Sequence, residues 1–226
     1  MRSASLVLVL ALSACSSGGS EPLVSGVWDR IKASRSKDDG SGPAGKQVPS
    51  REQIEKFDLA LVQMSLAGEN VWPIMFARSV NGPYATYAGG KFPQSLTLRE
   101  SQVTATRGLG TDLISASSSA NDPLKVLTPP GDWPAQVNRE YRFAGSGPQG
   151  RLERYTCVIQ KAAETQITLA GTTIDVVGFA ESCSGQDGTF QNLYAADART
   201  GRVWQSVQYI GAAMPMLTLE VLEPLG

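Results

Sequence analysis

Hydrophobic and polar residues alternate with a period of two along much of the chain from residue 59 to the C-terminus. The clearest stretches are residues 60–66, 96–99, 166–169 and 217–221. This alternation puts successive side chains on opposite faces of an extended backbone and predicts half-buried strands. Turn-forming residues separate such stretches at 81–83, 89–90, 145–150, 186–188 and 200–201. We therefore predict an all-β fold, an antiparallel meander that forms an open barrel or a sandwich.

The N-terminal region has a helical period instead. Apolar residues recur at helical spacing at Leu23, Val24, Val27, Trp28 and Ile31. They predict an amphipathic helix that packs on the domain core, on a partner or on a membrane interface. Residues 37–45 read as a linker, so the range 23–49 is assigned to a helix and a linker.

A second short helix is expected at the start of a β-rich domain that spans residues 50–226. Ser50 and Gln53 form a capping box, and Ile54 and Phe57 supply the buried side of this helix. Within the domain, residues 120–134 contain four prolines and read as a long surface loop.

The first 14 residues have the pattern of an export signal. Arg2 precedes an apolar stretch at residues 6–12, which is too short to span a bilayer as a helix. The segment that ends in Leu-Ser-Ala-Cys15 resembles the bacterial lipobox. That resemblance implies cleavage before Cys15, lipid on its sulfur, and a tether over residues 15–22. Ser16, not an acidic residue, follows the cysteine, and this resembles lipoproteins that are sorted to the outer membrane. We therefore expect a lipid-anchored domain in the outer membrane that faces the periplasm. A plain secretory leader with a free structural cysteine is the alternative.

Cys157 and Cys183 remain as an even pair in an oxidising compartment. Their midpoint falls at Ala170, next to Gly171, so a hairpin turn there would place the two sulfurs opposite each other. A structural disulfide is the favoured interpretation. Two separate buried thiols, or a redox-active pair without a Cys-x-x-Cys motif, stay open as alternatives.

Composition excludes several classes of function. The 20 basic and 21 acidic residues nearly balance, so no positive field favours nucleic acid. Histidine is absent, which excludes Ser-His-Asp triads, Cys-His dyads and histidine-ligated metals. We expect no catalytic residue, cofactor or metal. Glycoside cleavage needs only two carboxylates, and the candidates are Glu140, Asp175, Glu181 and Asp187. For Glu181, a cross-strand ion pair with Arg154 is the simpler interpretation.

A small set of residues could contact a polymer or a partner. Arg107 and Asp112 bracket a glycine corner at 108–110 and either hold its backbone or present charges to sugar hydroxyls. The aromatic candidates for stacking on sugar rings are Trp72, Tyr84, Tyr87, Trp133, Trp204 and Tyr209. Trp204 is out of phase with Val203 and Val207 and is predicted to point outward. The candidate contact residues are therefore Arg107, Asp112, Trp133 and Trp204.

Several motifs together resemble one known family. They lie at residues 104–116, 154–157, 171, 181–183, 190–194 and 206–211. This pattern is similar to the group 4 capsule polysaccharide lipoprotein family, YjbF/GfcB, with departures at Ala195 and Ala212. The resemblance implies a β-rich outer-membrane lipoprotein that works with polysaccharide export components, such as an outer-membrane β-barrel, or with the polysaccharide itself. It implies no established catalytic residues.

Three functional hypotheses follow. The favoured one is a non-enzymatic accessory or scaffold in exopolysaccharide or capsule export. A carrier of lipid or polysaccharide would instead have an open-barrel cavity, and Met64, Phe76, Met214 and Met216 are candidates for its lining. A carboxylate-dependent glycosidase or lyase would need a cleft with two converging carboxylates.

Overall fold

The computed structural model describes residues 46, 48–90, 93–145 and 150–226. The predicted signal peptide, the lipidated Cys15, its tether and the amphipathic helix lie outside the described residues. Among the described residues, no helix combines the length and the apolar character needed to cross a membrane.

The described residues form one short helix, α2 (Arg51–Glu55), a 3-10 turn (Pro130–Asp132), and 12 strands. The strands are β1 (Leu61–Leu66), β2 (Ile74–Asn81), β3 (Tyr84–Gly89), β4 (Ser95–Arg99), β5 (Gln102–Arg107), β6 (Leu113–Ser118), β7 (Gln136–Phe143), β8 (Arg151–Leu169), β9 (Thr172–Gly185), β10 (Gly188–Asp197), β11 (Val203–Gln208) and β12 (Leu217–Glu223).

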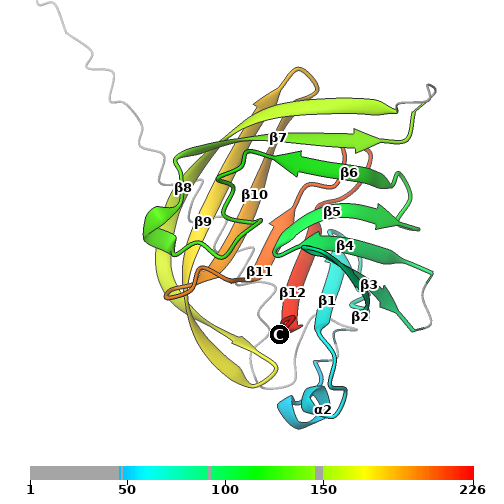
Figure 1. Ribbon diagram of the computed structural model, residues 1–226, viewed down its shortest axis with the longest axis vertical. Helices are drawn as coiled ribbons and strands as arrows, with labels where there is room; N and C mark the ends of the chain where they lie inside the picture. The colour runs from blue at the N-terminus through cyan, green and yellow to red at the C-terminus, as the bar shows by residue number, and fades with distance from the viewer. Residues whose placement is uncertain (1–45, 47, 91–92, 146–149) are drawn as a thin grey trace, which may run out of the picture.

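The strands form a single antiparallel sheet that curls into a nearly closed barrel (Figure 1). Consecutive strands pair as a meander except for β5 and β6, and β1 pairs with β12, so the two ends of the domain meet in the middle of the sheet. The edge strands are β5 and β6, which lie side by side. The all-β meander is confirmed, and the barrel is the architecture adopted.

Side chains bridge the seam between β5 and β6. The Leu113 amide donates to the Thr106 hydroxyl at 2.9 Å, and the Arg107 guanidinium donates to the Leu113 carbonyl at 3.0 Å. An exposed strand edge is a template for unwanted pairing. These bridges place the two edges against each other instead of leaving either edge open to solvent.

The long loop between β6 and β7 is exposed at residues 120–121, 126–127 and 131–132, as expected for a surface loop, but it also contributes side chains to the barrel core. Asp122 and Leu124 are almost completely buried, and the amides of Ser101 and Gln102 both donate to the Leu124 carbonyl. Further along, Gly201 packs so closely on this loop that an added Cβ would lie 1.7 Å from the Thr128 carbonyl oxygen. We call residues 119–134 the plug loop.

The capping box of α2 is present, because the Ser50 side chain accepts from the Gln53 amide and the Gln53 side chain accepts from the Ser50 amide. Ile54 is buried beside β1, as predicted. Phe57 is not buried. It lies beyond the helix, 45% exposed, and its ring meets the edge of Phe76 on the outer face of β2.

Candidate functional site

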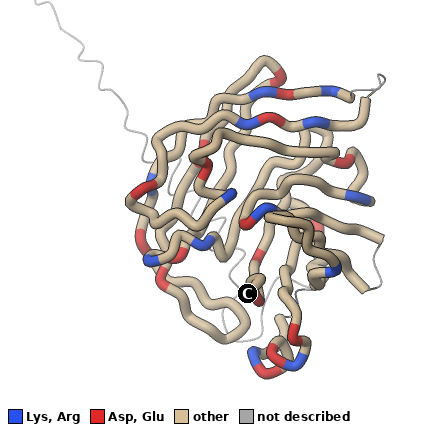
Figure 2. The backbone as a smooth tube through the Cα atoms, viewed as in Figure 1, with Lys and Arg blue, Asp and Glu red and all other residues tan. Residues whose placement is uncertain are grey.

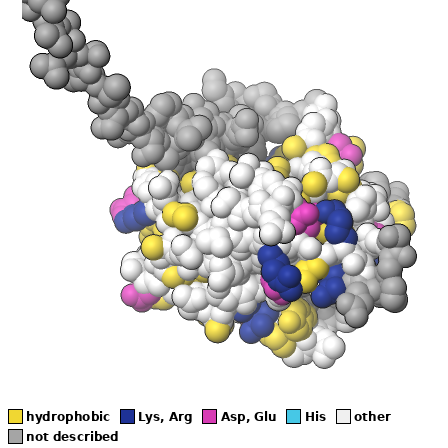
Figure 3. All heavy atoms as spheres, turned by 90° about the horizontal axis from the view of Figure 1, so that it is seen from above, with side chains coloured by type: hydrophobic (Ala, Val, Ile, Leu, Met, Phe, Trp, Pro, Cys, Tyr) yellow, Lys and Arg dark blue, Asp and Glu magenta, His cyan; other side chains and the backbone are white. Residues whose placement is uncertain are grey.

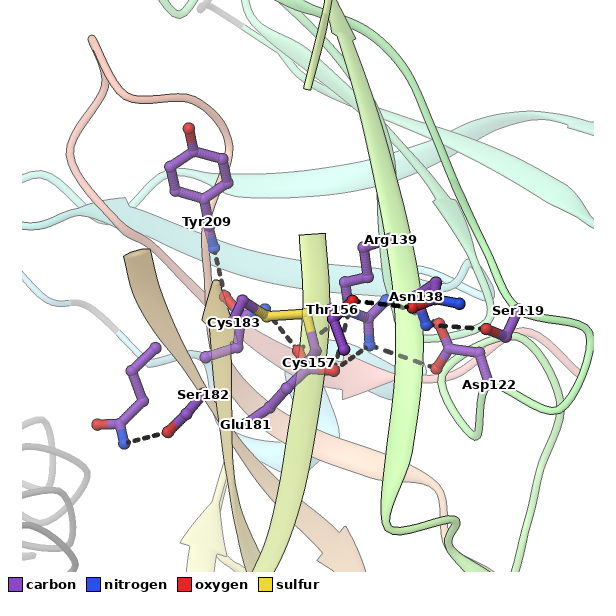
Figure 4. The surroundings of a disulfide bond; sticks show 12 residues. Ser119, Asp122, Asn138, Arg139, Thr156, Cys157, Glu181, Ser182, Cys183 and Tyr209 are labelled. Atoms are coloured by element: carbon purple, nitrogen blue, oxygen red, sulfur yellow. Dashed lines mark hydrogen bonds and ion pairs between the residues drawn. A yellow bond between two sulfur atoms is a disulfide. The ribbon is translucent and has the colours of Figure 1, made fainter. Parts of the chain in front are cut away.

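The predicted disulfide joins Cys157 on β8 to Cys183 on β9 (Figure 4). The two residues face each other in register, and the hairpin turns at Ala170 and Gly171. The register shifts by one residue between Lys161 and Glu164, so the turn is centred just beyond the midpoint of the cysteines. Both sulfurs point into the barrel, where the disulfide staples its two longest strands.

A buried ionic network lies next to this disulfide. The Arg139 guanidinium on β7 donates to both carboxylate oxygens of Glu181 on β9, at 2.8 to 3.0 Å. It also donates to Asp122 of the plug loop at 2.7 Å. Arg139 is 1% exposed, and both carboxylates are 0% exposed. Figure 4 shows the guanidinium between the two acidic side chains. We call these three residues the Arg139 network.

The predicted partner of Glu181 was wrong. Arg154 lies on the outer face of β8, where it donates to Glu140 at 2.6 Å. Glu181 on β9 and Arg139 on β7 both face the interior. Their strands are separated by β8. The burial of Arg139 was not predicted from the sequence. The alternation of Arg139 with Val137 and Tyr141 on β7 is the signal that could have indicated it.

Other polar groups complete the coordination of Glu181. The Asn192 amide and the Tyr194 hydroxyl each donate to one of its oxygens at 2.7 Å. Burial alone lowers the pKa of the Arg139 guanidinium, but the charge of Glu181, followed by Tyr194 and Asp122, raises it well above its ordinary value. Burial, and then the Glu181 charge, raises the pKa of Tyr194. The network is therefore a fixed and fully partnered set of charges.

A second buried carboxylate lies at one end of the barrel. Glu153 is 0% exposed, and one of its oxygens accepts from the hydroxyls of Tyr155 and Tyr209, both at 2.8 Å. Arg151 forms an ion pair with its other oxygen. Burial raises the pKa of Tyr155 to about 12. Around this carboxylate, the ring of Tyr209 stacks on that of Phe190 at 4.0 Å.

Arg107 and Asp112 hold the glycine corner between β5 and β6. The Asp112 carboxylate accepts from the Gly108 amide at 2.9 Å and from the Leu109 amide at 3.1 Å. Arg107 donates to backbone carbonyls on both sides of the corner. Of the two interpretations considered, these contacts match the one in which Arg107 and Asp112 hold the backbone of the corner.

Trp133 and Trp204 lie on opposite faces of the barrel wall. Trp133 belongs to the plug loop and stacks on Phe179 inside the barrel, with ring centroids 3.9 Å apart. Its indole N–H donates to the Thr128 carbonyl at 2.9 Å. Trp204 packs half-buried on the outer face against Ile167 and its neighbours. The structure therefore does not bring these two aromatics together.

The other aromatic candidates are divided in a similar way. Tyr87 and Tyr209 are buried in the core, whereas Tyr84 is 39% exposed beside Arg99. Lys46 lies over the ring of Trp72 at 4.6 Å.

The side chains proposed to line a carrier cavity do not share one cavity. Met64 belongs to the interior core, and Met214 and Met216 pack against that core. Phe76 lies on the outer face, next to Leu61. The interior of the described barrel is occupied by a continuous apolar cluster drawn from the strands and the plug loop.

Among the described residues, the atoms of Cys157, Cys183 and Glu181 lie close enough together to hold a metal. Both sulfurs are bonded to each other, so neither is a thiolate, which is the form that binds metals. Glu181 is already bound to Arg139. This cluster therefore does not fit a metal in the oxidised protein.

An open polar groove of about 500 Å³ lies on the outer face of β7, β8 and β9. Its walls carry the Glu140–Arg154 ion pair on one side and Ser184, Gln186 and Asp187 on the other. Figure 2 shows basic and acidic positions along both β7 and β8. Arg139 and Glu153 are buried, so the charged side chains of these strands that face the groove are Glu140 and Arg154. Two of the four carboxylates considered for glycoside cleavage, Glu140 and Asp187, line this groove, but Glu181 and Asp175 do not.

A family model described as group 4 capsule polysaccharide lipoprotein gfcB, YjbF matches residues 28–222. The chain belongs to this family. No curated protein matches. A crystal structure of the hypothetical lipoprotein YmcC from Escherichia coli (K12) has a similar fold, with a TM-score of 0.66 and 17% sequence identity. The similarity covers 77% of this chain and 89% of that one.

Four of the motifs that resemble the YjbF/GfcB family, at residues 154–157, 181–183, 190–194 and 206–211, meet in the barrel. Residues 181–183 carry Glu181 and one half of the disulfide, and residues 190–194 carry Asn192 and Tyr194, which donate to Glu181. The Asn192 side-chain oxygen in turn accepts from the Tyr209 amide at 2.7 Å. These separate segments thus build one hydrogen-bonded cluster.

Proposed function

We propose that this member of the YjbF/GfcB family is a lipid-anchored, non-catalytic accessory protein of capsule or exopolysaccharide export. In this proposal Cys15 carries the lipid, and the barrel faces the periplasm from the outer membrane. The observation that carries the proposal is the family match, which extends from residue 28 to residue 222 and includes all of the barrel except its last residues.

The geometry of the acidic residues supports a non-catalytic role. Glycoside cleavage needs one carboxylate that donates a proton and a second that attacks or activates water, both facing an open cleft. Asp122 and Glu181 are close together but have no exposed surface, and both are bound by Arg139. Glu140, in the open groove, is paired with Arg154.

The test is complementation of a deletion strain by the wild-type gene and by variants. We expect deletion to reduce the amount of surface polysaccharide and the wild-type gene to restore it. Cys15→Ala should fail to restore it, because the protein would no longer be held at the membrane. Asp187→Asn and Glu140→Gln should leave the chain length of the polymer unchanged, since neither acts in a cleavage step.

Membrane fractionation with palmitate labelling measures the anchor directly. Wild-type protein should be labelled and recovered with the outer membrane, and Cys15→Ala should be neither. Normal polysaccharide in the deletion strain would refute the role in export. Unlabelled wild-type protein would refute the anchor, and longer polymer in either carboxylate variant would indicate an enzyme.

A further inference from the structure

We propose that the groove on the outer face of β7, β8 and β9 binds a neutral, hydroxyl-rich segment of a carbohydrate polymer. This inference rests on the proposed role in polysaccharide export and names the surface that would contact the polymer. Neither the plug loop nor the residues first considered as contacts, Arg107, Asp112, Trp133 and Trp204, form part of it.

Strand register arranges the polar groups of the groove in a row. Asn138 on β7 pairs with Thr156 on β8, which pairs with Ser184 on β9. All three side chains are exposed on the outer face. Adjacent strands are about 4.8 Å apart, so the row presents an amide and two hydroxyls over roughly 10 Å. The Thr156 hydroxyl donates to the Asn138 side chain at 3.3 Å, which leaves further donor and acceptor positions of these groups facing the groove.

Charged groups lie two residues further along the strands, on the same face. Glu140 pairs with Arg154 across β7 and β8, and Gln186 and Asp187 follow Ser184 in the turn between β9 and β10. The Asp187 carboxylate is exposed, and none of the described residues donates a hydrogen bond to it in the structure. A carboxylate with unoccupied acceptor positions next to a guanidinium can bind neighbouring hydroxyls, because each hydroxyl both donates and accepts.

Gly185 brings the turn against the floor of the groove. A Cβ at this position would lie 2.1 Å from the Arg154 carbonyl oxygen and 2.8 Å from the Tyr155 ring. The turn backbone therefore rests directly on β8, and the exposed residues Gln186 and Asp187 line one side of the groove. Leu152, half-buried at one end, provides an apolar surface for the C–H face of a sugar ring.

The charge of the groove favours a neutral ligand. Its lining contains two exposed carboxylates, Glu140 and Asp187, and one exposed guanidinium, Arg154, which Glu140 already binds. A polyanion would meet a net negative surface. In the view from above (Figure 3), much of the visible surface of the described residues is uncharged, and basic and acidic groups lie next to each other in small sets. Mixed donors and acceptors with little net charge match sugar hydroxyls better than carboxylate or phosphate groups.

Binding is measured by calorimetry with the mature, lipidated protein in detergent. The probe is the exopolysaccharide of the bacterium that carries the gene, hydrolysed to oligosaccharides and separated by anion exchange into neutral and acidic fractions. We expect the neutral fraction to bind. Asp187→Asn and Ser184→Ala should each weaken binding about tenfold, because each variant loses one hydrogen bond to the sugar and leaves the sugar group without its partner. Asp175→Asn is the matched control, because Asp175 is an exposed carboxylate on β9 outside the groove.

Three results would overturn the inference. These are tighter binding of the acidic fraction, no binding of either fraction, and neutral binding that Asp187→Asn and Ser184→Ala leave unchanged. Thermal unfolding and thiol titration of each variant establish that the barrel and disulfide are intact. If the groove fails this test while deletion still reduces surface polysaccharide, the proposed function stands without the groove. Normal polysaccharide in the deletion strain would refute the proposed function by itself.

Discussion

Replacement of Arg139 by leucine should be one of the most destabilising single changes in the barrel. The change removes the cation that contacts both Glu181 and Asp122, and it leaves two carboxylates in positions with 0% exposure. Leucine also fills less of the space that the guanidinium occupies. The remaining donors to Glu181, from Asn192 and Tyr194, are neutral and cannot replace the lost charge.

Removing one partner of a buried ion pair costs about 3–5 kcal/mol, because the other charge is left buried without compensation. Here one arginine serves two carboxylates, so we expect a loss at the upper end of that range. A domain is typically stable by about 5–15 kcal/mol, so this loss would consume a large fraction of the total. Urea unfolding followed by tryptophan fluorescence measures the change as a lower midpoint at an unchanged slope.

Arg154→Leu is the matched control, since its ion pair with Glu140 lies on the surface, with side chains 70% and 44% exposed. Surface pairs contribute at most about 1 kcal/mol. If Arg139→Leu does not fold, Arg139→Lys keeps the charge while losing the two-pronged contact and should give an intermediate loss. Glu181→Gln added to Arg139→Leu should recover part of the stability. A loss below about 1 kcal/mol for Arg139→Leu would refute the reasoning.

Three further changes test other parts of the structure. Replacing Cys157 and Cys183 with alanine should lower the free energy of unfolding by roughly 3 kcal/mol, measured with urea, as expected for a link across 26 residues; no change would indicate a redundant staple. Burial raises the pKa of Glu220 above 4.5, although Lys46 and Gln205 oppose this shift. Protonated Glu220 therefore stabilises the fold below the unfolded-state pKa, and this stabilisation is lost as the pH rises through the folded-state pKa. Glu220→Gln should therefore flatten the fall in unfolding free energy from pH 4 to 7, and an unchanged profile would contradict this. Gly201→Ala should cost at least about 1–3 kcal/mol in thermal unfolding, because φ is +77° and the new Cβ would overlap the plug loop.

Period-two alternation predicted strands well because it reports which face of each strand is buried. It could not distinguish a barrel from a sandwich, since that depends on which distant strands pair. The decisive pair is β1 with β12, which are separated by most of the domain. Local sequence does not encode that contact, so the way in which the meander closes had to come from the structure.

The same alternation failed where the strand register is irregular. Val203 and Val207 were placed on one face, but an extra residue in β11 opposite Ala195 and Ala196 shifts the register. Val203 therefore packs in the core, whereas Val207 packs on the outer face beside Leu193. Trp204 does point outward, as predicted. The disulfide prediction holds because a similar shift in β8 lies between the cysteines and the turn. This shift brings Cys157 opposite Cys183 although the turn is centred between Ala170 and Gly171.

Polar residues were the least predictable part of the candidate site. Glu181 and Arg139 look like ordinary surface charges in the sequence, and only the barrel brings them together with Asp122 from the plug loop. The cost of burying each charge is offset only because the other two charges are present, so no single position in the sequence predicts the burial. The burial of Asp122 was missed in a similar way. The prolines of the plug loop suggest a surface connection, and no apolar period around Asp122 predicts that it is buried.

The division between interior and exterior also indicates where specificity can evolve. Inside, Glu181 is held by Arg139, Asn192 and Tyr194, so a change at one of these positions leaves a buried polar atom unpaired. Such residues are constrained by stability, whatever the protein binds. On the outer face, Ser184 and Asp187 support no internal contact in the described structure and can change without loss of the fold. If the groove binds polymer as proposed, its side chains can therefore be changed to alter binding without disturbing the buried network.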